Sequence, residues 1–240
     1  SSETSLRLPA AIFGACLVAL PILMRTLIGS YGSLIASSIL AISPTLLYFS
    51  RFARADIILA FLTLAIVITI WRYFRKQQAR NIYIMAALLA LALATKESSF
   101  VHLAIIGGFI LALSREDIER CIQRKQSLTD LSPPGVILLL IGGLTLPHWV
   151  PALAYIIQGP LQLILVNDLK ELGQIGMPLG ATVFQMAGQP ITTGAVISTL
   201  LVTVFGIIGF SLLVSWNKRQ ALVAFAIFYA IWLSLFTTFF

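Results

Sequence analysis

The chain has 240 residues, of which 59% are apolar and 10% are charged, and its mean hydropathy is +0.97. A soluble domain carries about 25% charged residues, so this composition excludes an ordinary soluble protein and indicates an integral membrane protein. The apolar runs are longer than the alternating segments of about ten residues that build a membrane β-barrel. The sequence therefore predicts an all-α fold, a polytopic bundle of transmembrane helices.

The apolar runs divide the chain into candidate membrane spans, each of which needs about 20 mainly apolar residues. We expect about eight spans, over residues 8–28, 32–50, 55–74, 80–95, 98–114, 135–151, 194–216 and 220–240. Gly29 and Gly32 are expected to bracket the turn between the first two spans, and Pro44 to kink the second. The whole chain, 1–240, is predicted to be one transmembrane domain and a fragment of a longer protein, truncated at both ends.

One segment, 152–193, differs from the rest. Its apolar part, Tyr155–Val166, is too short to span a bilayer and is interrupted at Gly159 and Pro160. We expect an outer loop that carries an interfacial helix lying on the membrane. A plain connecting loop is the alternative.

The net charge of +7 indicates how the chain is oriented. If the spans alternate and Ser1 lies outside, the inner loops collect eleven of the sixteen basic residues. This asymmetry follows the rule that cytoplasmic loops carry the excess of Lys and Arg. It predicts an integral membrane protein with Ser1 on the outer side and membrane lipid as a partner, and it argues against a nucleic-acid partner. We expect the membrane to be a prokaryotic plasma membrane.

Two charged clusters interrupt the apolar runs, and this orientation places both at the outer face. The first is "YFSRFARADIIL" at 48–59, with Arg51, Arg54 and Asp56. An arginine there can bind an anionic phosphate, for which the guanidinium fork is well shaped, and Asp56 can orient it. The alternative is structural: the arginines anchor helix ends at the headgroups, and Asp56 caps the next helix.

The second cluster is "LALATKESSFVH" at 91–102, with Lys96 and Glu97 at the tip of a tight helical hairpin. Lys96 can act as a point-charge ligand for phosphate, and Glu97 as its partner, although a solvated turn explains both residues equally well. The sequence identifies no firm metal site. A divalent metal ion remains an open possibility as a cofactor, with Asp56, Glu97 and His102 as the candidate ligands.

Three blocks of this sequence together resemble the membrane glycosyltransferases of the C superfamily: "SLRLPAAIFG", "ISPTLLYFSRFARADIILAF" and "LALATKESSF". The likeness is to the branch of the protein mannosyltransferases, the aminoarabinose transferase and the archaeal-type flippase-associated glycosylation proteins. The blocks match in order and spacing over Ser5 to Phe100, and beyond them only the hydropathy is similar.

The resemblance implies an enzyme that moves a hexose or pentose from a polyprenyl-phosphate donor to an acceptor at the outer membrane face. It places residues matching Arg51 and Asp56 in the wall of the active site, and one matching Lys96 near the same cavity. Glu97 departs from the Lys-Gly form that is commoner in the family, so its role is inferred only from its position beside Lys96.

The resemblance also places the catalytic carboxylate upstream of the "RLPA" block, so we expect it before Ser1 and expect the fragment alone to be inactive. The predicted function is therefore a lipid-linked-sugar glycosyltransferase whose donor phosphate contacts Arg51, Arg54, Asp56, Lys96 and Glu97. A lipid-carrier flippase or transporter, and a non-catalytic subunit of a membrane complex, are the alternatives.

Overall fold

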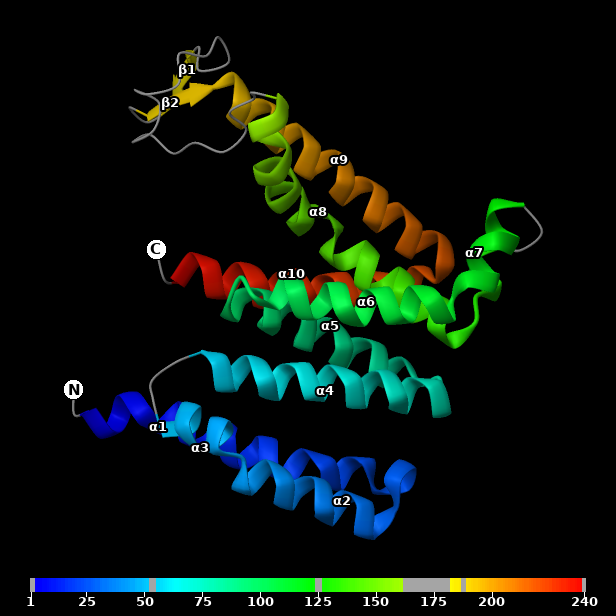
Figure 1. The fold of residues 1–240 in the computed structure, drawn as a ribbon. Helices are drawn as coiled ribbons and strands as arrows, with labels where there is room; N and C mark the ends of the chain where they lie inside the picture. The colour runs from blue at the N-terminus through cyan, green and yellow to red at the C-terminus, as the bar shows by residue number, and fades with distance from the viewer. Residues whose placement is uncertain (1–2, 52–54, 124–126, 162–181, 187–188, 239–240) are drawn as a thin grey trace. The chain divides into compact units, whose positions relative to one another are not determined.

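The computed structural model describes residues 3–51, 55–123, 127–161, 182–186 and 189–238. They are almost entirely helical (Figure 1), so the predicted all-α fold class is confirmed. The chain divides into two compact units: unit 1 comprises Ser1–Leu138 and Arg219–Phe240, and unit 2 comprises Leu139–Lys218.

The elements are described here in chain order. The first part of the chain forms α1 (Glu3–Ala19), the 3-10 helix η1 (Leu20–Met24), α2 (Arg25–Ile42), α3 (Pro44–Arg51), α4 (Asp56–Arg75), α5 (Ala79–Thr95), α6 (Ser99–Leu113) and α7 (Arg115–Ile122). A second 3-10 helix, η2 (Leu128–Asp130), precedes α8 (Pro133–Leu161), β1 (Thr182–Met186), β2 (Gln189–Thr192), α9 (Thr193–Trp216) and α10 (Lys218–Thr238).

Within the described residues, five helical stretches are long and apolar enough to cross a membrane: Arg7–Ile42, Asp56–Arg75, Pro133–Val150, Thr199–Trp216 and Lys218–Leu235. A sixth is present if α6 and α7, bent by 67° at their junction, count as one span. Each of the eight predicted ranges contains a helix among the described residues. The first range and the start of the second lie in the stretch Arg7–Ile42, and α5, with 17 residues, is short.

Several helices expose apolar side chains that water would not solvate. On α6, Ile105 and Phe109 are 67% and 64% exposed, and on α2 Ile42 is 72% exposed. Contiguous apolar surface of this kind marks contact with lipid or a partner, and in a bilayer the acyl chains cover it without cost. The exposed faces therefore fit the membrane class that the composition predicts.

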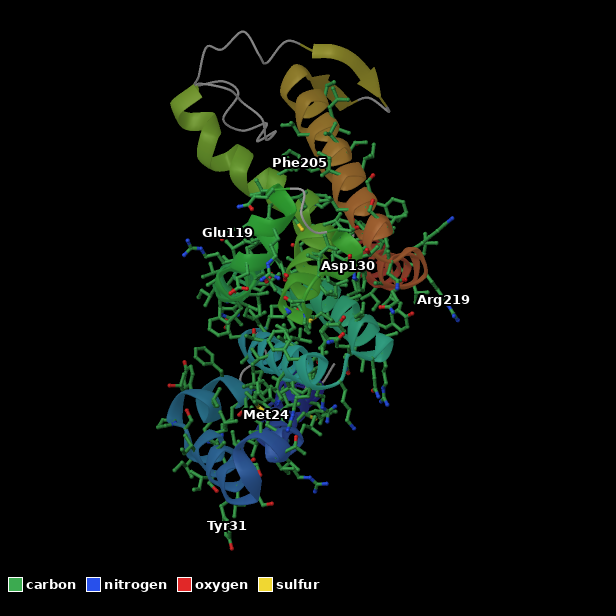
Figure 2. The ribbon with its side chains drawn as sticks, turned by 90° about the vertical axis from the view of Figure 1, so that its right-hand side faces the viewer. Met24, Tyr31, Glu119, Asp130, Phe205 and Arg219 are labelled. Carbon is green, nitrogen blue, oxygen red and sulfur yellow. The ribbon has the colours of Figure 1, made fainter. Side chains whose placement is uncertain are left out.

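In unit 1, α4 lies between α1 and α5 (Figure 1). A buried cluster joins α1 and η1 to α4 through Ala10, Leu17, Leu20, Ile57 and Ile68. Met24, labelled in Figure 2, lies where η1 meets α2 and packs against this cluster, whereas Tyr31 projects away from the unit.

A small residue sets how closely α1 approaches α3. A Cβ atom added to Gly14 would lie 2.8 Å from the Cβ of Ser50, so only glycine permits this approach.

The second predicted span, 32–50, is not one helix. It ends at Ile42, and Ser43 is extended, with φ −61° and ψ 117°, before α3 begins at Pro44. Proline disfavours helical geometry in the residue before it but suits the first turn of a new helix. Pro44 therefore breaks this span where a kink was predicted. Gly29, with φ 75°, interrupts α2 where the sequence predicts a turn.

In unit 2, α8 and α9 pack through glycines. A Cβ atom at Gly209 would lie 2.4 Å from the carbonyl oxygen of Gly143, so these two backbones touch. Within the predicted outer loop, 152–193, the structure describes the end of α8, through Leu161, and an antiparallel hairpin that pairs Thr182 with Thr192 and Met186 with Gln189. The hairpin was not predicted. The rest of the expected interfacial helix lies outside the described residues.

Candidate functional site

The two charged clusters meet in an ion pair between α4 and the turn after α5. The ammonium group of Lys96 donates a hydrogen bond to Oδ1 of Asp56, forty positions away in the chain. The side chains are 43% and 29% exposed, so the pair is accessible from one end of unit 1. This contact agrees with the expectation that both clusters lie at one membrane face.

The ends of α4 and α5 stabilise the charges of Asp56 and Lys96. Asp56 lies in the first turn of α4, and Lys96 follows the last residue of α5 as its C-cap. A helix carries roughly half a positive charge at its N-terminus and half a negative charge at its C-terminus. Each side chain is therefore stabilised by its own helix as well as by its partner. The N-cap residue of α4 is Ala55, so Asp56 does not cap this helix as the structural alternative predicted.

The turn between α5 and α6 is short and closed by its own backbone. The amides of Ser99, Phe100 and Val101 donate to the carbonyls of Lys96, Glu97 and Ser98 over 3.0, 3.1 and 3.1 Å. Glu97 is exposed at the tip, and in the described part of the chain no residue forms an ion pair with it. The turn thus fixes the backbone of Lys96 while leaving the Glu97 carboxylate in solvent.

Arg51 lies at the end of α3 and lines a separate cavity of about 260 Å³. The walls come from α1, α2, α3 and the start of α4, and apart from Ser50 and Arg51 their side chains are apolar, as at Leu17, Leu47 and Ile57. Arg51 does not pair with Asp56. The structure thus brings Lys96 and Asp56 together and places Arg51 at an apolar hollow. Arg54 lies outside the described residues.

His102 lies on α6, about one turn after Ser98, and faces α4. Its Nδ1 is 3.0 Å from Oγ1 of Thr63, whose hydroxyl also donates to the carbonyl of Leu59 over 2.8 Å. A hydroxyl has one proton, so when Thr63 donates that proton to the carbonyl of Leu59, its oxygen can only accept a hydrogen bond from Nδ1 of His102. His102 therefore joins α6 to α4. The residues that the structure describes contain no cluster of three His, Cys, Asp or Glu side chains able to hold a metal ion.

Two polar residues of this region were not identified from the sequence. Thr63 lies two turns after Asp56 on α4, and Ser99 lies one turn before His102 on α6. The side chain of Ser99 is fully buried, and none of the described groups is a hydrogen-bond partner of its hydroxyl. Helical spacing is the signal that would have found both, because residues three or seven apart share a helix face.

The comparison with protein families covers this region. A family model described as dolichyl-phosphate-mannose-protein mannosyltransferase matches residues 1–141, which include both members of the ion pair. No curated protein and no solved structure matches the chain. The matching family is of the glycosyltransferase C type, so the resemblance stated from the three sequence blocks is confirmed, and the chain is a membrane glycosyltransferase of that type. The chain belongs to the dolichyl-phosphate-mannose-protein mannosyltransferase family.

Proposed function

We propose that this protein transfers a sugar from a polyprenyl-phosphate donor to an acceptor at the outer face of a prokaryotic plasma membrane. Arg51, Arg54, Asp56, Lys96 and Glu97 line the donor-phosphate site. The observation that carries the proposal is the Lys96–Asp56 ion pair, because it joins two of the sequence blocks that resemble the family. The distribution of basic residues along the chain supports the outer face and the position of Ser1 outside.

The proposed site combines the two kinds of group that an amphipathic donor needs. A lipid-linked sugar needs cations for its phosphate and an apolar surface for its isoprenoid chain. Lys96 is exposed and cationic at the hairpin tip, and Arg51 lies at the edge of an apolar cavity of about 260 Å³. The arginine forms no ion pair with a described residue, so its guanidinium fork is available for bidentate binding of phosphate oxygens.

The chemistry gives the cations a specific task. The bond between the sugar's anomeric carbon and the phosphate oxygen breaks, the acceptor oxygen bonds to that carbon, and the acceptor's proton passes to a carboxylate base. Negative charge develops on the departing lipid phosphate, and fixed cations near it lower the barrier. Asp56 holds Lys96 in position, so it acts here as a positioning residue. The proposal assigns the base to none of the described residues.

The test uses the protein expressed from its complete gene and measures transfer of labelled sugar from a polyprenyl-phosphate donor in isolated membranes. Arg51→Ala and Lys96→Ala should each lower transfer by about 100-fold, the usual loss when one charge-stabilising donor is removed. Arg115→Ala, which removes a charge paired with Glu119 on α7, is the control and should leave the rate unchanged.

Wild-type transfer by Arg51→Ala and Asp56→Ala would overturn the site assignment. Movement of the lipid-linked sugar across vesicles with no transfer to any acceptor would favour the flippase alternative instead.

A further inference from the structure

A second polar pocket lies in unit 1, away from the ion pair. It has a volume of about 830 Å³ and is formed where η1 meets α2 and where α4 meets α5. Five basic residues line it, and no acidic residue is among its lining side chains. The five are Arg25, Arg72, Arg75, Lys76 and Arg80.

Hydrogen bonds hold the walls of this pocket together. Nη1 of Arg75 donates to the carbonyl oxygen of Thr26 over 2.8 Å, which ties α4 to α2. On the other side, the side-chain amide of Asn81 and the backbone amide of Gln78 donate to the carbonyl of Lys76 over 3.0 and 2.7 Å. These hydrogen bonds hold the backbone segments around the pocket in place.

The five cations have no internal counter-charge. Among the described residues, none of them has a carboxylate within ion-pair distance, and all five side chains are exposed. The basic residues of α7 differ, because Arg115 and Arg120 pair with Glu119 and Glu116 over 2.8 and 3.0 Å. Like charges gathered in one hollow repel one another, so the pocket favours an anion.

Apolar and aromatic side chains complete the lining of the pocket. They come from Ile22, Leu23, Trp71 and Ile84. Cations and apolar side chains together match a molecule with an anionic head and an apolar body.

The pocket faces the opposite membrane surface from the ion pair. Asp56 begins α4, whereas Arg72 and Arg75 lie in its last turn. A helix of 20 residues is about 30 Å long, the thickness of the apolar part of a bilayer. One helix therefore separates the pocket from the proposed donor site, so the pocket is not part of that site.

We propose that this pocket binds the phosphate headgroup of an anionic membrane lipid from the leaflet opposite the Asp56–Lys96 pair. The five cations surround the phosphate, and the acyl chains leave along Ile22 and Leu23. Basic pockets between membrane helices bind anionic headgroups in this way.

The experiment measures binding of dioleoylphosphatidylglycerol to the purified, delipidated full chain by native mass spectrometry, with dioleoylphosphatidylcholine as the zwitterionic reference. The double variant Arg72→Gln with Arg80→Gln should bind the anionic lipid about thirtyfold more weakly, because each cation near an anionic surface contributes several-fold. The matched control is Arg115→Gln with Arg120→Gln, which removes the same number of charges outside the pocket and should bind as the unaltered chain does.

Equal losses in the two double variants would show attraction by net charge alone and would overturn the pocket. Unchanged binding in the Arg72→Gln and Arg80→Gln variant would overturn it as well. Glycerol 3-phosphate tests the source of the phosphate: if it binds as tightly as the lipid, the site is one for a soluble anion and the lipid assignment is wrong.

A second variant guards against loss of fold. Arg72→Lys with Arg80→Lys keeps both charges, so it should bind the anionic lipid nearly as the unaltered chain does, with unchanged thermal unfolding. If this variant lost as much binding as the Gln variant, positive charge would not be what the pocket uses, and the proposal would be wrong.

Discussion

At the scale of single residues, the most informative contact is between Lys96 and Asp56. Each charge is stabilised by the end of its own helix, and both side chains remain partly exposed. An exposed ion pair contributes only about 0–1 kcal/mol to the free energy of unfolding, because solvent screens it. The pair therefore contributes little to stability. Its main effect is to hold the Lys96 ammonium group in a fixed position.

Lys96→Met should therefore change the stability of the protein little and its transfer activity strongly. The free energy of unfolding should change by less than about 1 kcal/mol, while transfer from the lipid donor falls sharply. Both quantities can be measured on the same purified variant, by detergent-induced unfolding and by the transfer reaction. Lys96→Arg, which keeps the charge, should recover part of the activity. A large loss of stability with normal transfer would show a structural role only.

Asp117 is the opposite case, a buried carboxylate with a structural task. It is 6% exposed, and it accepts hydrogen bonds from the backbone amide of Ser132, over 3.2 Å, and from the hydroxyl of the same residue. These bonds hold α7 against the start of α8, which begins at Pro133.

Asp117→Ala should lower the free energy of unfolding by about 1.5–3 kcal/mol, the range for hydrogen bonds to a charged group. Detergent-induced unfolding measures this change. Glu119→Ala, which removes an exposed carboxylate from the same helix, is the control and should cost less than about 1 kcal/mol. Equal costs for the two variants would contradict the role given to Asp117.

At the scale of helices, the approach of α1 to α3 depends on Gly14, because an added Cβ would lie 2.8 Å from that of Ser50. The same two helices form walls of the cavity that Arg51 lines. The spacing of the pair therefore determines the shape of this cavity.

Gly14→Ala should push α1 and α3 apart, destabilise the protein by about 1–3 kcal/mol, as overpacking does, and reduce transfer. The matched control is Gly107→Ala on α6, where no atom lies within 4 Å of the added Cβ. This control should stabilise the chain by about 0.5–1 kcal/mol, because alanine favours the helix over glycine. Thermal unfolding of the two variants in one detergent measures both effects, and equal stabilities would contradict the close packing.

The helices differ in how far the sequence could predict them. Among the described residues, hydropathy located the long apolar helices, because long apolar runs have few other solutions, and alternation of spans predicted that Lys96 and Asp56 lie at one end. The break at Ser43 was only partly predicted, since a proline can kink a helix or end it. The paired strands Thr182–Met186 and Gln189–Thr192 were missed because the whole segment 152–193 was interpreted as an outer loop with an interfacial helix.

The contacts between helices could not be predicted from the sequence. The bond between Thr63 and His102 depends on how α4 and α6 are rotated about their axes, which hydropathy does not specify when lipid and protein interior are equally apolar. The pocket at Arg25 and Arg72 likewise needs two distant turns to meet. Basic residues were predicted for this face, but their convergence was not.

At the scale of the whole molecule, the two proposed sites should be reached from opposite sides of the membrane. In a chain whose Cys16 and Cys121 are replaced by serine, Glu97→Cys should react with a membrane-impermeant maleimide in intact cells. Lys76→Cys should react only after the cells are permeabilised. Labelling of both positions from one side would contradict the topology, and the reverse pattern would invert the orientation while leaving the two sites on opposite faces.

The distribution of charge along α4 has a consequence for insertion. Arg72 and Arg75 are in the last turn of the helix and Asp56 is in the first. An energised bacterial membrane is negative inside, and moving one elementary charge across it is worth about 2.3 kcal/mol for each 100 mV. In the orientation proposed above, this voltage would draw the arginine end of α4 inward and resist its exit. The membrane potential would then help to determine the orientation of this helix during insertion and to maintain it afterwards.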